Sequence, residues 1–166
     1  ASIAGFFGNF LLGYLPYTMW LTFFPFAETS YEWNAKNPRS WSAYISINVI
    51  SSFACAVTIG LMVDALGFVP YAVVSRIIAI NNIIGNFLGV ILLFAGYDVT
   101  KNQLGLLWID VMRVKPVGLS VRGICGAWII AIGSIAGLCA GFIPGLPTTA
   151  IIWSSLMLII LGSLIL

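Results

Sequence analysis

Uncharged amides in the middle of apolar runs are the side chains of this sequence best suited to bind a ligand. The four asparagines concerned are Asn48, Asn81, Asn82 and Asn86. At 100° per residue, a helix over 71–95 carries a polar face made of Ser75, Asn82, Gly85, Asn86 and Gly89, with Asn81 at its edge. A helix over 41–63 carries a second polar stripe made of Asn48, Ser51, Ser52, Cys55 and Thr58.

Two roles are open to these polar stripes. The amides and hydroxyls can form hydrogen bonds between helices, which are worth about 0.6–2 kcal/mol each in a membrane. They can instead line a pocket, where amides suit an uncharged or zwitterionic ligand because they offer both donors and acceptors. We take the pocket as the functional hypothesis, with all four asparagines as candidate ligand-binding residues.

No part of the sequence forms a catalytic or metal-binding pattern. It has no histidine, the commonest metal ligand and the usual general base. The three cysteines lie in apolar runs without a CxxC pair, and we predict that they pack as small hydrophobic residues: Cys55, Cys125 and Cys139. The five carboxylates lie in loops or at the ends of apolar runs, and no glycine-rich phosphate loop is present. We therefore predict a protein that is not an enzyme, with no metal site and no cofactor.

The composition explains why the chemistry is so restricted. Only 7% of the 166 residues are charged and 61% are hydrophobic, whereas a soluble domain has roughly 25% charged and about 45–50% apolar residues. Such a chain cannot cover a soluble surface with polar groups. The composition excludes a soluble enzyme, a nucleic-acid-binding protein and a disordered chain, and it predicts one integral membrane domain over 1–166 in contact with lipid.

The apolar runs predict an all-α bundle of about five transmembrane helices. Crossing a bilayer takes about 20 mostly apolar residues, and five runs are long enough: about 3–27, 41–63, 71–95, 123–143 and 148–166. Between the third and fourth runs, residues 101–113 have the pattern of a short amphipathic helix lying in the headgroup region. That helix would serve as a surface anchor or as a docking surface for a partner.

The basic residues predict the orientation of the bundle. With five spans, the loops at 28–40 and 96–122 share one side and hold six of the seven basic residues: Lys36, Arg39, Lys101, Arg113, Lys115 and Arg122. The seventh, Arg76, lies just inside the third run. The positive-inside rule places these loops in the cytoplasm, the N-terminus outside and the C-terminus inside, in an inner or plasma membrane. Because the chain begins outside without methionine, we expect that a segment was processed away or that an upstream helix is missing.

Glycines at four-residue spacing predict close helix contacts. They are Gly133, Gly137 and Gly141 in the fourth run, and Gly85 and Gly89 in the third. Small residues at this spacing let helix backbones approach closely in lipid. The partner helix can belong to this chain or to another membrane subunit.

One N-terminal segment resembles the Gly-Asn…Gly-Tyr-Leu-Pro-Tyr…Trp segment of substrate-binding membrane subunits of energy-coupling-factor transporters: Gly8-Asn9-Phe10-Leu11-Leu12-Gly13-Tyr14-Leu15-Pro16-Tyr17-Thr18-Met19-Trp20. Residues 63–70 with Asn81-Asn82, and Gly105-Leu106-Leu107-Trp108, are similar to later segments, so the resemblance covers about 1–112. It implies a bundle of about six helices that binds a vitamin or related micronutrient near the outer face. It also implies a coupling subunit, contacted in that family through a first helix that this chain lacks, and cytoplasmic ATPases.

These observations lead to two functional hypotheses. The first is a non-catalytic membrane protein that binds a small micronutrient-like ligand for uptake, with a separate partner supplying the energy. The alternative is a structural or accessory subunit of a larger membrane complex. In the alternative, the polar stripes only hold helices together and the glycine faces contact other membrane subunits.

Overall fold

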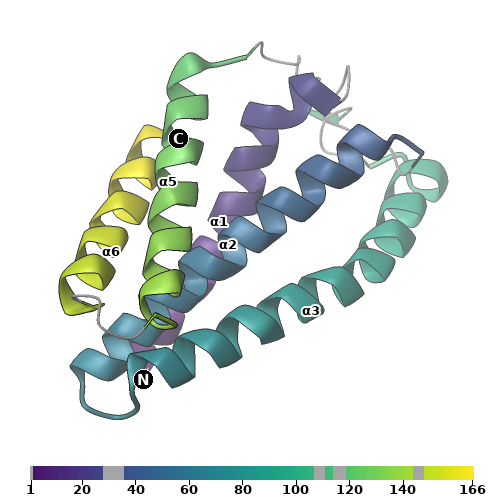
Figure 1. Cartoon of the computed structure of the whole chain (residues 1–166). Helices are drawn as coiled ribbons and strands as arrows, with labels where there is room; N and C mark the ends of the chain where they lie inside the picture. Colours follow the sequence, from purple (N-terminus) through teal and green to yellow (C-terminus); the bar gives the residue numbers. More distant parts are fainter. Residues whose placement is uncertain (1, 28–35, 107–110, 114–118, 144–147) are drawn as a thin grey trace.

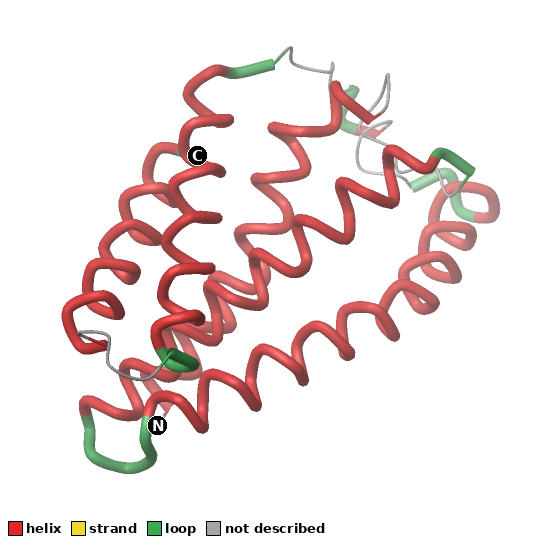
Figure 2. The backbone as a smooth tube through the Cα atoms, viewed as in Figure 1, coloured by secondary structure: helices red, strands yellow, loops and turns green. Residues whose placement is uncertain are grey.

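The protein is built from α-helices, as the apolar runs predict (Figure 1). A computed structural model describes residues 2–27, 36–106, 111–113, 119–143 and 148–166. Within these ranges the chain forms five α-helices and one short π-helix, and it contains no strand (Figure 2). The predicted all-α class is therefore confirmed.

The helices are long and apolar enough to cross a membrane. Their bounds are α1 (Ser2–Ala27), α2 (Pro38–Ala65), α3 (Tyr71–Asp98), η1 (Val99–Gln103), α5 (Val121–Ala140) and α6 (Thr148–Ile165). Four of them meet the length and hydropathy of a membrane span: α2, α3 with η1, α5 and α6. The remaining helix, α1, has 26 residues and no charged side chain. This agrees with a bundle of about five spans.

Polar side chains mark the points where α2, α3 and α5 begin. Asn37 caps α2 because its Oδ1 accepts a hydrogen bond from the Arg39 backbone N–H at 3.0 Å, so α2 begins three residues before the predicted start. Ser120 caps α5 in the same way, through the N–H of Gly123 at 3.2 Å. At the other end of the bundle, Asp64 Oδ1 accepts from the N–H of Tyr71 at 3.1 Å. These caps satisfy backbone donors where the chain enters the bundle.

The separate helix predicted over 101–113 is not formed as one element. Residues 101–103 instead continue α3 as the π-helix η1. Two side-chain pairs at i, i+4 support this extension, from Lys101 Nζ to Tyr97 OH at 2.9 Å and from Asn102 Nδ2 to Asp98 Oδ1 at 2.7 Å. The extension ends at Gly105, whose φ of +61° is the left-handed conformation that glycine adopts most readily. Residues 107–110 and 114–118, including Lys115 and Trp108, lie outside the described residues.

Helix α2 occupies the centre of the bundle (Figure 1). It contacts α1, α3, α5 and α6, and α5 pairs closely with α6. The buried core joins α1, α2, α5 and α6 through Leu15, Met19, Val57, Ile130 and Ile159. In contrast, α3 packs almost entirely on α2, and only 6% of its most apolar window is buried, against 61% for α2. The remaining surface of α3 is open.

Glycines bring α5 close to its neighbours. A Cβ added to Gly133 would lie 2.9 Å from Leu158 Cβ of α6. One added to Gly137 would lie 2.9 Å from both Ser155 Cβ of α6 and Val57 Cγ2 of α2. These distances leave no room for a side chain, so α5 meets α2 and α6 with almost bare backbone at these positions.

The other predicted glycines lie in different surroundings. A Cβ added to Gly141, just after α5, would lie 3.1 Å from the ring of Tyr71. Gly85 and Gly89 have no atom within 4 Å of an added Cβ, so they make no close contact within the described part of the chain. Gly162 of α6 was not predicted, yet its added Cβ would lie 2.8 Å from the carbonyl oxygen of Gly126 on α5.

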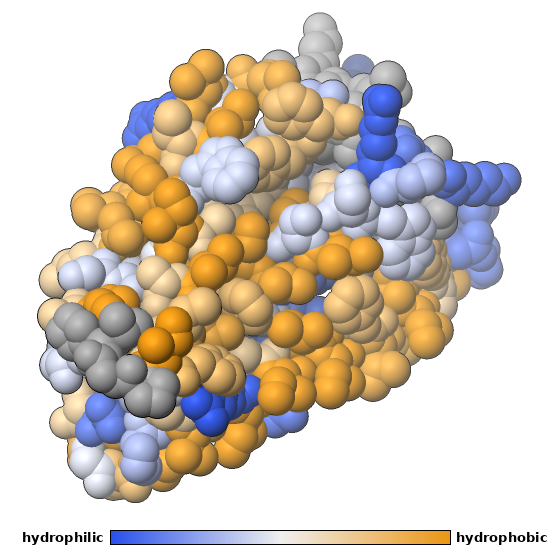
Figure 3. All heavy atoms as spheres, viewed as in Figure 1, coloured by the Kyte–Doolittle hydropathy of each residue, from blue (hydrophilic) through white to orange (hydrophobic). Residues whose placement is uncertain are grey.

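The surface of the bundle is that of an integral membrane protein. Figure 3 shows hydrophobic side chains over most of the visible face, with hydrophilic ones gathered toward the two ends. The described basic residues of the long loops lie at the end where α2 and α5 begin and α3 finishes: Lys36, Arg39, Lys101, Arg113 and Arg122 (Figure 1). Two cysteines also face outward, Cys125 and Cys139. Of the three cysteines predicted to pack as small hydrophobic residues, only Cys55 is buried, and lipid accepts the other two because it is as apolar as a core.

Candidate ligand cavity

Two of the candidate asparagines connect α3 to α2. Asn82 Nδ2 donates to Cys55 Sγ at 3.3 Å, and Asn86 Nδ2 donates to Ser52 Oγ at 3.2 Å. The hydroxyl of Tyr44 on α2 donates to the backbone oxygen of Asn86 at 3.0 Å. The two polar stripes therefore face each other directly, as in the interpretation that assigns them to interhelical hydrogen bonds.

The other two candidate asparagines are apart from this contact. Asn48 is buried on α2, and Asn81 is exposed on α3. The structure thus does not gather the four amides around one space. None of them lines the large cavity of the bundle, which lies on the opposite side of α2 from α3.

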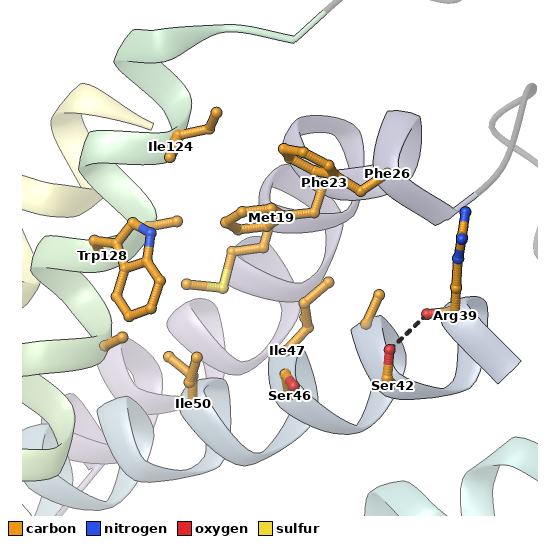
Figure 4. Close-up of a pocket in the computed structure, with 13 residues that line it drawn as sticks. Met19, Phe23, Phe26, Arg39, Ser42, Ser46, Ile47, Ile50, Ile124 and Trp128 are labelled. Atoms are coloured by element: carbon orange, nitrogen blue, oxygen red, sulfur yellow. Dashed lines mark hydrogen bonds between the residues drawn. The ribbon is translucent and has the colours of Figure 1, made fainter.

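That cavity has a volume of about 570 Å³ and lies between α1, α2 and α5 (Figure 4). Helix α1 lines it with Met19, Phe23 and Phe26. Helix α5 lines it with Ile124, Ala127, Trp128 and Ala131. Apart from the indole N–H of Trp128, these two walls are apolar, which suits the hydrocarbon part of a ligand.

The wall that α2 contributes changes from polar to apolar along the helix. Arg39, Ser42 and Ser46 lie toward its beginning, and Ile47 and Ile50 lie deeper in the bundle (Figure 4). Figure 4 shows Arg39 at one end of the cavity and Trp128 toward the other. At ~1.5 Å per residue, the stretch of α2 from Arg39 to Ile50 spans about 16 Å, roughly half of a ~30 Å hydrocarbon core. The cavity therefore fits within one leaflet.

The Arg39 guanidinium is available for a ligand. The side chain is exposed, and it forms no ion pair or hydrogen bond with the part of the chain that the structure describes. Its backbone is engaged instead, since the Arg39 N–H donates to Asn37 Oδ1 at 3.0 Å and the Arg39 carbonyl oxygen accepts from Ser42 Oγ at 2.9 Å. A planar guanidinium whose donors have no partner among the described residues can bind a carboxylate or phosphate in a bidentate manner.

Two polar side chains at the start of α3, Tyr71 and Arg76, are occupied by structural contacts. Arg76 donates to the carbonyl oxygen of Gly141 at 2.9 Å, and its guanidinium carbon lies 4.0 Å from the centre of the Phe142 ring. The hydroxyl of Tyr71 donates to the carbonyl oxygen of Gly137 at 2.7 Å. Both contacts fix the start of α3 against the end of α5. No cluster of three or more potential metal ligands occurs among the described residues.

The cavity was not predicted from the sequence, because its lining residues form no recognisable sequence pattern. Most lining residues are ordinary apolar side chains from three helices far apart in the sequence. The one available signal was the spacing of Arg39, Ser42 and Ser46, which puts a cation and two hydroxyls on one face of the first two turns of α2. In the sequence, Arg39 was used only to predict orientation.

The fold and the cavity define the class of this chain: an integral membrane protein with an all-α bundle and an intramembrane cavity. Comparison with protein-family models, curated proteins and solved structures finds no match to it.

Proposed function

We propose that the protein binds a small, largely apolar molecule in the cavity between α1, α2 and α5 and performs no chemistry on it. The observation that carries this proposal is the cavity itself, whose volume of about 570 Å³ lies within the ~300–1,000 Å³ range of small-molecule sites. Its walls are apolar apart from Arg39, Ser42 and Ser46 at one end and the indole N–H of Trp128.

We assign this binding to uptake of a micronutrient-like compound with the help of a partner. We assign the supply of energy to another subunit, because the sequence shows no nucleotide-binding loop. The resemblance of residues 1–112 to substrate-binding subunits of energy-coupling-factor transporters implies the same division of labour, but it places the ligand near the outer face, whereas this cavity lies at the basic end of the bundle. In this proposal the basic end of the bundle is cytoplasmic and the N-terminus is outside, as the positive-inside rule predicts.

A brominated long-chain alcohol provides the test of binding. The chain is reconstituted in nanodiscs of neutral phosphatidylcholine, and quenching of tryptophan emission is measured as the alcohol is added. Trp128 lines the cavity, so we expect a saturable component of quenching that disappears in Trp128→Phe. The variant Ala43→Phe, which puts a ring into the cavity wall, should weaken that component at least tenfold.

The matched control is Ala72→Phe, an equally half-buried alanine on α3 that does not line the cavity. The brominated alcohol should quench the tryptophan emission of this variant as it does that of the unmodified protein. The proposal is wrong if no saturable component appears, or if Ala43→Phe and Ala72→Phe behave alike.

A second candidate function is an accessory subunit of a membrane complex, favoured by the open surface of α3. Most of this helix is unburied, and Gly85 and Gly89 leave a strip of backbone accessible to another helix. Gly85→Leu would then disrupt a complex purified in mild detergent while leaving quenching by the brominated alcohol unchanged. An unaltered complex would exclude this surface as the contact.

A further inference from the structure

The polarity of the cavity identifies the chemical class of its ligand. Building on the proposed function, we infer that the cavity takes a single-chain amphiphile whose anionic headgroup is bound by Arg39 and whose chain lies between α1, α2 and α5. The lining supports this arrangement because its charged and hydroxyl-bearing residues occupy one end only, with Arg39, Ser42 and Ser46 before Ile47 and Ile50 along α2.

Charge complementarity favours an anionic headgroup. No described residue forms an ion pair with the Arg39 guanidinium. Lys36, Lys101 and Arg122 belong to the same end of the bundle, so the described residues of that end carry a net positive charge. Of the two described carboxylates, Asp64 lies at the opposite end and Asp98 accepts a hydrogen bond from Asn102. A phosphate or carboxylate at Arg39 would find a free bidentate donor in an attractive field.

The size of the cavity favours one chain over two. A volume of about 570 Å³ holds roughly twenty groups of water-like size at ~30 Å³ each. That number suits one long alkyl chain or a compact ring system with a headgroup, and it is too small for both chains of a phospholipid. The ~16 Å of α2 that lines the cavity also matches the depth of one leaflet, so the headgroup at Arg39 would lie at the membrane surface.

The test compares brominated ligands that differ only in headgroup. A brominated alkyl phosphate and the alcohol of the same chain are added to the full chain in phosphatidylcholine nanodiscs, and the saturable quenching of Trp128 is followed. We expect the phosphate to bind about tenfold more tightly than the alcohol, a difference of about 1.4 kcal/mol. Arg39→Gln should abolish this preference for the phosphate without weakening the binding of the alcohol. Arg39→Lys should retain part of the preference.

Arg122→Gln is the matched control, because it removes one exposed positive charge from the same end without altering the cavity lining. It should leave the preference for phosphate intact. Equal affinities for phosphate and alcohol, or equal effects of the Arg39 and Arg122 variants, would overturn the inference while leaving the proposed function standing. Tighter binding of a brominated two-chain phosphatidylglycerol would also overturn it and would make the cavity a bilayer phospholipid site. If none of the probes gives saturable quenching, the proposed function is wrong as well.

Discussion

Replacing Gly162 by alanine tests the close approach of α5 and α6. The added Cβ would lie 2.8 Å from the carbonyl oxygen of Gly126 and 3.0 Å from the backbone N of Ile130. Backbone atoms cannot move aside by changing rotamer, so the two helices have to separate. Overpacking of this kind costs about 1–3 kcal/mol, while alanine gains ~1 kcal/mol of helix propensity over glycine.

The same substitution at Gly85 isolates the packing contribution. Nothing lies within 4 Å of a Cβ added there, so Gly85→Ala gains the propensity without the clash. The free energy of unfolding of Gly162→Ala should therefore fall about 1–3 kcal/mol below that of Gly85→Ala. Reversible unfolding in mixed micelles, followed by circular dichroism, measures this difference. If Gly162→Ala is as stable as Gly85→Ala, α5 and α6 do not meet at this glycine and the reasoning fails.

Three further predictions concern polar contacts and orientation. A double-mutant cycle of Asn86→Leu and Ser52→Ala, measured by the same unfolding assay, should give a coupling energy of about 0.6–1.7 kcal/mol, because the two side chains are hydrogen-bonded. Ser134→Ala should leave the free energy of unfolding unchanged or raise it by up to ~1 kcal/mol, because its buried Oγ has no partner within the described residues. A green fluorescent protein fused to the C-terminus should fluoresce in cells, and a periplasmic alkaline phosphatase fused there should be inactive, since we propose a cytoplasmic C-terminus.

Each of these predictions has a contradicting result. A coupling energy near zero would mean that Asn86 and Ser52 do not interact in the membrane. Loss of more than ~1 kcal/mol in Ser134→Ala would assign that hydroxyl a hydrogen bond. An active phosphatase at the C-terminus would reverse the orientation and place Arg39 on the outer side.

The helices were predictable because hydrocarbon imposes so strong a constraint on sequence. Apolar runs of the right length gave all five helices, and residues 71–95 and 123–143 differ from α3 and α5 by a few residues at their ends. The extension of α3 through η1 was not predicted, because the apolar run ends at residue 95 and the extension depends on polar pairs of Lys101 and Asn102 with residues of α3. Helix ends depend on such local contacts, which hydropathy does not report.

The site was harder to predict than the fold for a physical reason. An amide in lipid needs a hydrogen-bond partner whether or not a ligand is present. The sequence pattern of Asn82 and Asn86 is therefore the same for ligand binding as for hydrogen bonds between helices. In the structure their partners are on α2. The cavity is defined by where side chains leave space between α1, α2 and α5, and no periodicity in one helix carries that information.

The central position of α2 has a consequence for how the protein is made. During synthesis, α2 enters the membrane directly after α1 and directly before α3, and both of these neighbours pack against it. The first three helices can therefore assemble through contacts between consecutive segments, before the rest of the chain has left the ribosome. Helices α5 and α6 then pair as a hairpin through their glycines and dock on α2. The third wall of the cavity is added only by this last step, because that wall is α5, so the complete ligand site forms only when α5 has docked.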